Sequence, residues 1–166
     1  GSVREQIDAA SGDRSPLRRL STNLDTAQVY LTAWEATSQR IWFDRARAIL
    51  RLVGEVSARL GFALPDFYDE EWRPLPASSD QGPIELIRPA DTVPGLGFKA
   101  ARLIGQVSAI LGRMGEPIGP WMLDTATALY DRAIADGWTD QGVGGIVYTL
   151  DPAGALAAPE RMHWVV

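Results

Sequence analysis

The sequence predicts an all-α domain built from helical hairpins, in which inner helices are ringed by outer ones. Two segments that are apolar on nearly all sides, 24–37 and 94–114, alternate with two amphipathic segments, 40–60 and 120–136. A helix that is apolar all round is packed on several sides, whereas an amphipathic helix keeps one face in solvent. The alternation therefore predicts two hairpins in two layers, each with one inner and one outer helix.

The first hairpin is predicted over residues 24–60, after a polar segment, 3–20, that indicates one short helix. Its inner helix, Leu24–Thr37, carries apolar side chains nearly all round. In residues 40–60, apolar side chains recur at helical spacing along one face that starts at Trp42, and charged side chains recur along another. Gly61 follows at the position where glycine commonly ends a helix.

A proline-rich segment, residues 62–93, separates the two hairpins. It contains no convincing helix, and its β-propensity favours short strands near Phe67-Tyr68 and Ile84–Ile87. A connection of this length in a compact domain usually has a functional or a packing role.

The second hairpin is predicted over residues 94–136. A Pro-Gly pair marks the entry to its inner helix, which is the most apolar helix of the chain. The outer helix begins at Pro120 and ends at Gly137, as helices with an N-terminal proline and a C-terminal glycine do. Beyond it, the run Ile146–Leu150 predicts one strand of a short β-hairpin near 146–160.

Composition and charge limit the classes of function. The chain has 166 residues, which suits a single helical domain over 3–166, and Gly1-Ser2 is interpreted as an expression scar. A net charge of −5 without a basic patch argues against a nucleic-acid surface. No apolar run is long enough for a membrane span, and a single histidine, His163, is a poor metal site. We expect a soluble, cytoplasmic protein with no metal or cofactor and no nucleic-acid or membrane partner.

Several motifs in combination resemble those of the N-acylglucosamine 2-epimerase family, which includes mannose and sulfoquinovose isomerases and cellobiose epimerases. The motifs are Ala33-Trp34-Glu35-Ala36-Thr37, Trp42-Phe43-Asp44-Arg45-Ala46, Arg88-Pro89, Pro94-Gly95, Ala101-Arg102-Leu103, Gly137-Trp138, the run Gly144–Asp151, and His163-Trp164. The resemblance covers about residues 20–166. It implies an (α/α)6 barrel considerably longer than this chain, so the expected fold is a partial (α/α) barrel that is similar to the middle of the family fold.

The resemblance also implies where a pocket would lie. The candidate pocket residues are Asn23, Asp25, Gln28, Arg88, Leu96 and Lys99. The family carries histidine at the positions of Asp25 and Leu96, and glutamate at the positions of Gln28 and Lys99, so four of its functional positions are replaced here. Arg88 is the main pocket residue that still matches.

These replacements predict that isomerase activity is lost. Sugar isomerisation moves a proton next to a carbonyl, which needs a base that titrates near neutral pH, and histidine is the usual choice. Leu96 has no proton to move, Gln28 cannot act as a base, and a carboxylate at Asp25 is a weaker base. Losing the general acid and the general base should remove about 10²–10⁴-fold in rate for each.

Two functions from different classes remain open. In the first, the chain is an engineered or degenerate barrel fragment that serves as a scaffold, an assembly unit or a binding domain; the concentration of changes at one site and the abrupt ends of the chain favour it. In the second, the chain is a residual sugar isomerase or a repurposed enzyme that uses Lys99, the only lysine in the sequence. Apolar neighbours disfavour the ammonium form, and a neutral amine can form a Schiff base with a carbonyl compound. The structural alternative is a surface lysine or an ion pair with Asp25.

The open faces of an incomplete barrel predict self-association. Unclosed helical faces expose apolar surface, and identical patches pair most simply about a two-fold axis. We therefore expect a dimer through these faces, and a small-molecule ligand is the other partner that the inner-helix cavity would accept.

Overall fold

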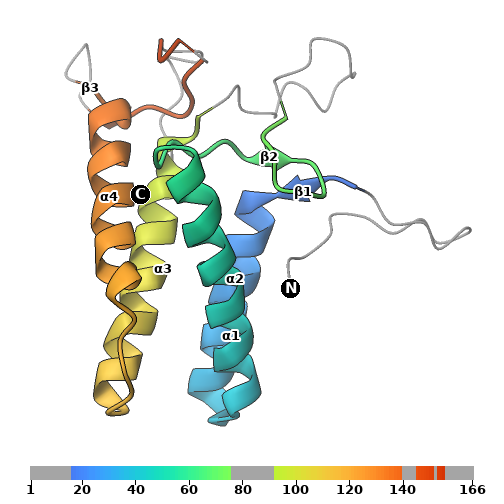
Figure 1. The fold of residues 1–166 in the computed structure, drawn as a ribbon, viewed down its shortest axis with the longest axis vertical. Helices are drawn as coiled ribbons and strands as arrows, with labels where there is room; N and C mark the ends of the chain where they lie inside the picture. Colours follow the sequence, from blue (N-terminus) through green and yellow to red (C-terminus); the bar gives the residue numbers. More distant parts are fainter. Residues whose placement is uncertain (1–15, 76–91, 140–144, 152, 156–166) are drawn as a thin grey trace, which may run out of the picture.

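The computed structural model describes residues 16–75, 92–139, 145–151 and 153–155. These residues form two antiparallel helical hairpins that stand side by side, with the short strands gathered at one end (Figure 1). The elements are β1 (Arg18–Arg19), α1 (Leu20–Thr37), α2 (Arg40–Arg59), β2 (Phe67–Tyr68), α3 (Pro94–Arg113), α4 (Pro120–Gly137), β3 (Trp138–Thr139) and β4 (Gly145–Ile146). The predicted all-α class is confirmed, and the hairpins are α1–α2 and α3–α4.

Helix α1 begins at Leu20, one turn before the predicted start at Leu24, because a distant loop caps its first turn. The carboxylate of Asp66 accepts hydrogen bonds from the backbone N–H of Ser21 at 2.7 Å and from the Ser21 hydroxyl at 3.0 Å. The same carboxylate pairs with the guanidinium of Arg19 at 2.9 Å. No side chain next to the helix caps it, so local sequence contains no signal for this start.

The predicted strand at Phe67-Tyr68 is present, and its partner is β1. The two strands are antiparallel, with Arg18 opposite Tyr68 and Arg19 opposite Phe67. The sequence did not indicate a strand at residues 18–19. The strand predicted at 84–87 and the short helix predicted within 3–20, in residues 3–15, lie outside the described residues.

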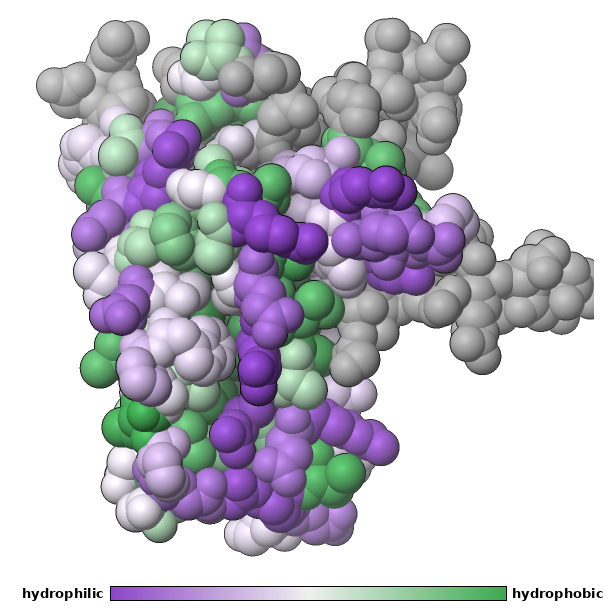
Figure 2. All heavy atoms as spheres, viewed as in Figure 1, coloured by the Kyte–Doolittle hydropathy of each residue, from purple (hydrophilic) through white to green (hydrophobic). Residues whose placement is uncertain are grey.

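Helix α2 buries one face and exposes a charged one, as predicted. Hydrophilic side chains run as a column over α2 in Figure 2. The core-facing side chain of its first turn is Phe43, whereas we expected Trp42 there. Trp42 is half-buried and stacks on Tyr30 of α1, with ring centroids 5.6 Å apart. Gly61 adopts a φ of +59°, the left-handed conformation that favours glycine after a helix.

Helix α3 is buried on several sides, as its all-round apolar sequence predicted, and it contacts α1, α2 and α4. Its start lies very close to the end of α4. A Cβ atom added at Gly137 would lie 2.6 Å from the Cβ of Pro94. Helix α4 therefore ends at a glycine for a packing reason, and not because a left-handed cap is needed there. Among the described residues, no helix combines the length and the apolar character needed to span a bilayer.

The β-hairpin that the structure describes near the C-terminal end joins β4 to the preceding strand, which the sequence did not predict. Strand β4 pairs with β3, with Trp138 opposite Ile146. Further along the run, Leu150 forms an isolated bridge with Thr92 at the entry to α3. The run Ile146–Leu150 is thus divided between two partners, which explains why its β-propensity did not reveal its pairing. Residues 156–160 lie outside the described part of the chain.

Candidate functional site

Three polar contacts join the two inner helices, α1 and α3. The ammonium of Lys99 forms an ion pair with the carboxylate of Asp25. Further along the helices, the Arg102 guanidinium donates to the Gln28 amide oxygen at 3.0 Å, and the Gln106 amide donates to the Glu35 carboxylate at 3.2 Å. We call this row of six side chains the α1–α3 seam. In all three contacts, α3 supplies the donor and α1 supplies the acceptor.

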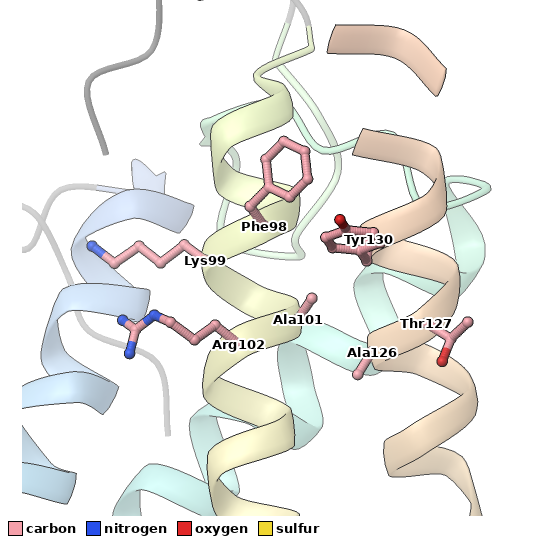
Figure 3. A pocket seen from close by; sticks show the side chains of 7 residues that line it. All are labelled: Phe98, Lys99, Ala101, Arg102, Ala126, Thr127 and Tyr130. Atoms are coloured by element: carbon pink, nitrogen blue, oxygen red, sulfur yellow. The ribbon is translucent and has the colours of Figure 1, made fainter. Parts of the chain in front are cut away.

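The ion pair in the seam is asymmetric in its burial. The Lys99 side chain is 11 % exposed, whereas the Asp25 side chain is 64 % exposed. Lys99 lies in the second turn of α3, and its side chain extends from there towards α1 (Figure 3). The structure therefore shows the ion pair with Asp25, which the sequence offered as a structural alternative to a catalytic Lys99.

The other candidate pocket residues are placed differently. Asn23 is buried in the first turns of α1, where its side-chain amide donates to the backbone carbonyl of Arg19 at 2.8 Å. Leu96 is part of the hydrophobic core. Arg88 lies outside the described residues. The structure thus brings Asp25, Gln28 and Lys99 together on the seam and places Asn23 and Leu96 in the interior.

Two hollows flank the seam. One has a volume of about 450 Å³ and lies on α1; it is lined by Asp25, Gln28, Val29, Thr32, Ala33 and Ala36. The other has a volume of about 510 Å³ and lies between α3 and α4; it is lined by Phe98, Lys99, Ala101, Arg102, Ala126, Thr127 and Tyr130. In Figure 3 the charged ends of Lys99 and Arg102 point towards α1, away from the aromatic part of the second hollow.

Aromatic side chains line the α3–α4 hollow, and no motif in the sequence indicated that they would lie together. The rings of Phe98 and Tyr130 meet edge to face, with centroids 5.4 Å apart and an interplanar angle of 75°. Such pairs add to the stability of helix packing beyond the area that they bury. The sequence of α4 does contain an apolar stripe on the solvent side of the helix. Helical spacing alone, however, did not show that no other element covers this stripe.

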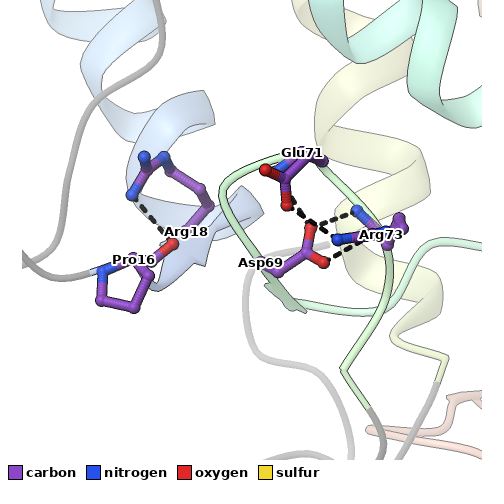
Figure 4. Close-up of polar contacts among 5 residues, drawn as sticks. All are labelled: Pro16, Arg18, Asp69, Glu71 and Arg73. Carbon is purple, nitrogen blue, oxygen red and sulfur yellow. Dashed lines mark hydrogen bonds and ion pairs between the residues drawn. The ribbon is translucent and has the colours of Figure 1, made fainter.

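Arg73 pairs with two of the three acidic side chains of the turn at residues 69–71. Asp69 accepts backbone N–H groups from Glu71 and Arg73, and the Arg73 guanidinium lies 2.7 Å from Asp69 and 2.9 Å from Glu71 (Figure 4). The Arg73 backbone hydrogen bond is the main reason why the pKa of Asp69 is below its usual value. Within the described ranges, no group of histidine, cysteine or acidic side chains has the arrangement of a metal site.

A buried arginine near this turn was also missed. The Arg18 side chain is buried, and its guanidinium donates to the backbone carbonyl of Pro16 at 3.0 Å (Figure 4). It also donates to the backbone carbonyl of Leu17 at 3.0 Å. Buried charges need such partners, because a charge without hydrogen bonds is costly in the interior. Arg18 therefore stabilises the chain entry to α1 and lies away from the seam.

Comparison with known proteins identifies the family. The sequence model of N-acylglucosamine 2-epimerase (GlcNAc 2-epimerase) matches residues 2–166. The chain belongs to this family. Among its relatives, a D-mannose isomerase of Pseudomonas cannabina pv. alisalensis is 32 % identical over 165 residues, and a D-mannose isomerase of Thermobifida fusca is 34 % identical over 168 residues. These matches cover 99 % and 100 % of this chain but only 40 % of each relative.

The fold agrees with that of a solved D-mannose isomerase. A crystal structure of D-mannose isomerase superposes with a TM-score of 0.80 over 95 % of this chain and 39 % of that chain, at 22 % identity. At this identity the likeness shows the fold alone. The two hairpins described here are therefore a part of an epimerase-family α/α fold.

Proposed function

We propose that the chain is a degenerate or engineered segment of an N-acylglucosamine 2-epimerase barrel that lacks isomerase activity and serves as a scaffold, assembly or binding domain. The ion pair between Asp25 and Lys99 carries this proposal. The family resemblance implies a histidine and a glutamate at these two positions. Here position 25 carries an acidic side chain and position 99 a basic one. The ion pair between them leaves neither side chain free for proton transfer.

The neighbouring residues support the same conclusion. Proton abstraction next to a carbonyl needs a base within hydrogen-bond reach of the carbon acid. The Asp25 carboxylate is already engaged by Lys99, and the Gln28 amide oxygen accepts from Arg102. Leu96, at the second position where the family has histidine, contributes only an aliphatic side chain to the core.

A binding role remains compatible with the hollow on α1. Asp25, Gln28 and Thr32 give this hollow acceptor and hydroxyl groups beside the apolar surface of Val29 and Ala33. Its volume of about 450 Å³ falls within the range of small-molecule sites. Polar groups beside apolar surface suit a sugar, whose ring offers hydroxyls on its rim and C–H groups on its faces.

Proton exchange tests the proposal directly. The protein is incubated with D-mannose in D₂O, and proton NMR follows deuterium incorporation next to the carbonyl and the formation of a ketose. We expect no exchange above the buffer rate, while the Thermobifida fusca D-mannose isomerase, as a positive control, exchanges rapidly. Catalysed exchange that disappears in Asp25→Asn would overturn the proposal, because it would show that this carboxylate acts as a base.

A second candidate function is supported by the burial of the Lys99 stem beside the α3–α4 hollow. In this alternative, the Lys99 amine attacks the carbonyl carbon of an aldehyde or ketone, and a C=N bond forms with loss of water. The attack requires the ion pair with Asp25 to open first, which makes this candidate weaker than the first.

A further inference from the structure

Exposed apolar side chains gather on one stripe of α4. Leu123, Tyr130, Ile134 and Trp138 are between 37 % and 59 % exposed. The spacing of Leu123, Tyr130 and Ile134 places them on the same side of α4, with the exposed Thr127 among them, whereas Trp138 follows the last residue of the helix and belongs to β3. Figure 2 shows hydrophobic side chains along the edge of the molecule where α4 lies. We call Leu123, Thr127, Tyr130 and Ile134 the α4 stripe.

The α4 stripe borders the hollow between α3 and α4, so the apolar surface extends beyond one helix. Tyr130 belongs to both, and its ring packs against Phe98 in the hollow. Contiguous exposed apolar surface of this kind marks an interaction site. None of the four stripe residues is charged, although the chain has a net charge of −5. Two copies with the same net charge repel each other least where they meet through an uncharged face.

The order of side chains along the stripe is symmetric. Leu123 lies four residues before Thr127, and Ile134 lies four residues after Tyr130. When two α4 helices run antiparallel about the point midway between Thr127 and Tyr130, Leu123 faces Ile134 of the second copy. In the same arrangement, the small side chain of Thr127 faces the large ring of Tyr130 of the second copy. Large and small side chains thus alternate across the contact, as close packing requires.

We propose that the α4 stripe is a self-association face, on which a second copy of this chain packs its own α4 antiparallel about a two-fold axis. Identical faces that meet in this way form a closed dimer. The opposite edge of the molecule, on α1, offers a different surface: its hollow contains mostly small or polar side chains, and Val29 is its large exposed hydrophobic residue. The inference rests on the assembly role proposed above and names the surface that performs it.

Molar mass in solution gives the first test. Light scattering during size exclusion should report twice the chain mass of 18.1 kDa. The double variant Leu123→Arg/Tyr130→Arg should report a monomer, because it places two charges in each stripe. A matched control, Val29→Arg on α1, should remain a dimer. Circular dichroism checks that the variants are folded, and a monomeric unsubstituted protein would overturn the inference.

Cross-linking gives a second test that leaves the stripe nearly intact. The sequence contains no cysteine, so single-cysteine variants report single positions. Two Thr127→Cys residues would be offset by about 4.5 Å along the helix axes, whereas two Trp138→Cys residues, just past the end of α4, would be offset by more than about 25 Å. A short bis-maleimide should therefore cross-link Thr127→Cys and leave Trp138→Cys and Val29→Cys uncoupled. Cross-linking between Thr127→Cys and Val29→Cys copies in a mixture would show head-to-tail packing and would overturn the two-fold arrangement.

The two proposals fail in distinguishable ways. Catalysed proton exchange on D-mannose contradicts the proposed loss of isomerase activity, whatever the oligomeric state. A monomer, or a contact through α1, contradicts the α4 face, whatever the result of the exchange assay. Measuring exchange on both the dimer and the Leu123→Arg/Tyr130→Arg variant keeps the outcomes separate.

Discussion

Asp66 caps the first turn of α1 from a position 45 residues further along the chain, where its carboxylate accepts the backbone N–H of Ser21 at 2.7 Å. Asp66 is buried, and it also accepts the Ser21 hydroxyl and pairs with Arg19. One side chain therefore joins the start of the first inner helix to the loop that follows the first outer helix.

Removing this carboxylate should destabilise the whole hairpin. We expect Asp66→Ala to lower the free energy of unfolding by about 2 kcal/mol, because a helix cap and charge-assisted hydrogen bonds are lost together. Asp44→Ala is the control, since Asp44 is exposed and its ion pairs lie within one helix face, where such pairs contribute little. Urea unfolding measures both. An equal, small effect of the two substitutions would show that Asp66 does not act as a cap.

Two glycines in the second hairpin should respond in opposite directions to alanine. Gly137→Ala forces a methyl group to within 2.6 Å of the Pro94 ring, and overpacking of this kind costs about 1–3 kcal/mol. Gly105→Ala places its methyl group in open space within α3 and should stabilise the protein by about 0.5–1 kcal/mol through helix propensity. Thermal unfolding of the two variants compares them. Stabilisation by Gly137→Ala would contradict the close approach of α3 and α4.

The ion pair between Arg40 and Glu116 should make stability depend on pH. Arg40 donates to both carboxylate oxygens of Glu116, and this contact holds the pKa of Glu116 below its usual value of 4.5. A lowered folded-state pKa means that the stabilisation is present above pH 4.5 and is lost as pH falls through the folded-state pKa. The difference in melting temperature between the protein and Glu116→Gln should therefore shrink on acidification below about pH 5. The same comparison in an Arg40→Gln background should show little difference at any pH.

Reductive labelling distinguishes the two readings of Lys99. The protein is treated with an aldehyde and a mild reducing agent, and mass spectrometry locates the adducts. Because Asp25 holds the amine in an ion pair, we expect Lys99 to be labelled no faster than the N-terminal amine. Asp25→Asn should accelerate labelling at Lys99, and Lys99→Met should abolish the adduct at that position. Labelling of unsubstituted Lys99 well ahead of the N-terminus would support Schiff-base chemistry instead.

Helical periodicity predicted most of the fold because it reports burial directly. The amphipathic patterns of α2 and α4 and the apolar pattern of α3 placed these helices within a few residues of their observed bounds. The start of α1 and the strand β1 were missed because both depend on residues 66–68, which are distant in sequence. The pairing of β4 with β3 was not predicted, because a two-residue strand carries too little pattern to identify its partner.

The candidate site was predictable where the family motifs mark it and less so elsewhere. Asp25 and Lys99 were named as a candidate pair, and the structure shows that pair. The contacts of Arg102 and Gln106 were not foreseen, because they depend on how α1 and α3 are placed along each other. For Leu96, helical spacing alone left open whether the side chain faces a pocket or the core, since both surfaces accept an apolar residue.

The α1–α3 seam limits how the two hairpins slide past each other. A shift by one helical turn, about 5.4 Å, would place the Lys99 ammonium beside Gln28 in one direction and beside Thr22 in the other. Both are uncharged, so the ammonium of Lys99, whose side chain is 11 % exposed, would lose its counter-charge in either case. Apolar packing between helices tolerates such shifts more readily than an ion pair does. Lys99 therefore favours a single longitudinal alignment of the hairpins.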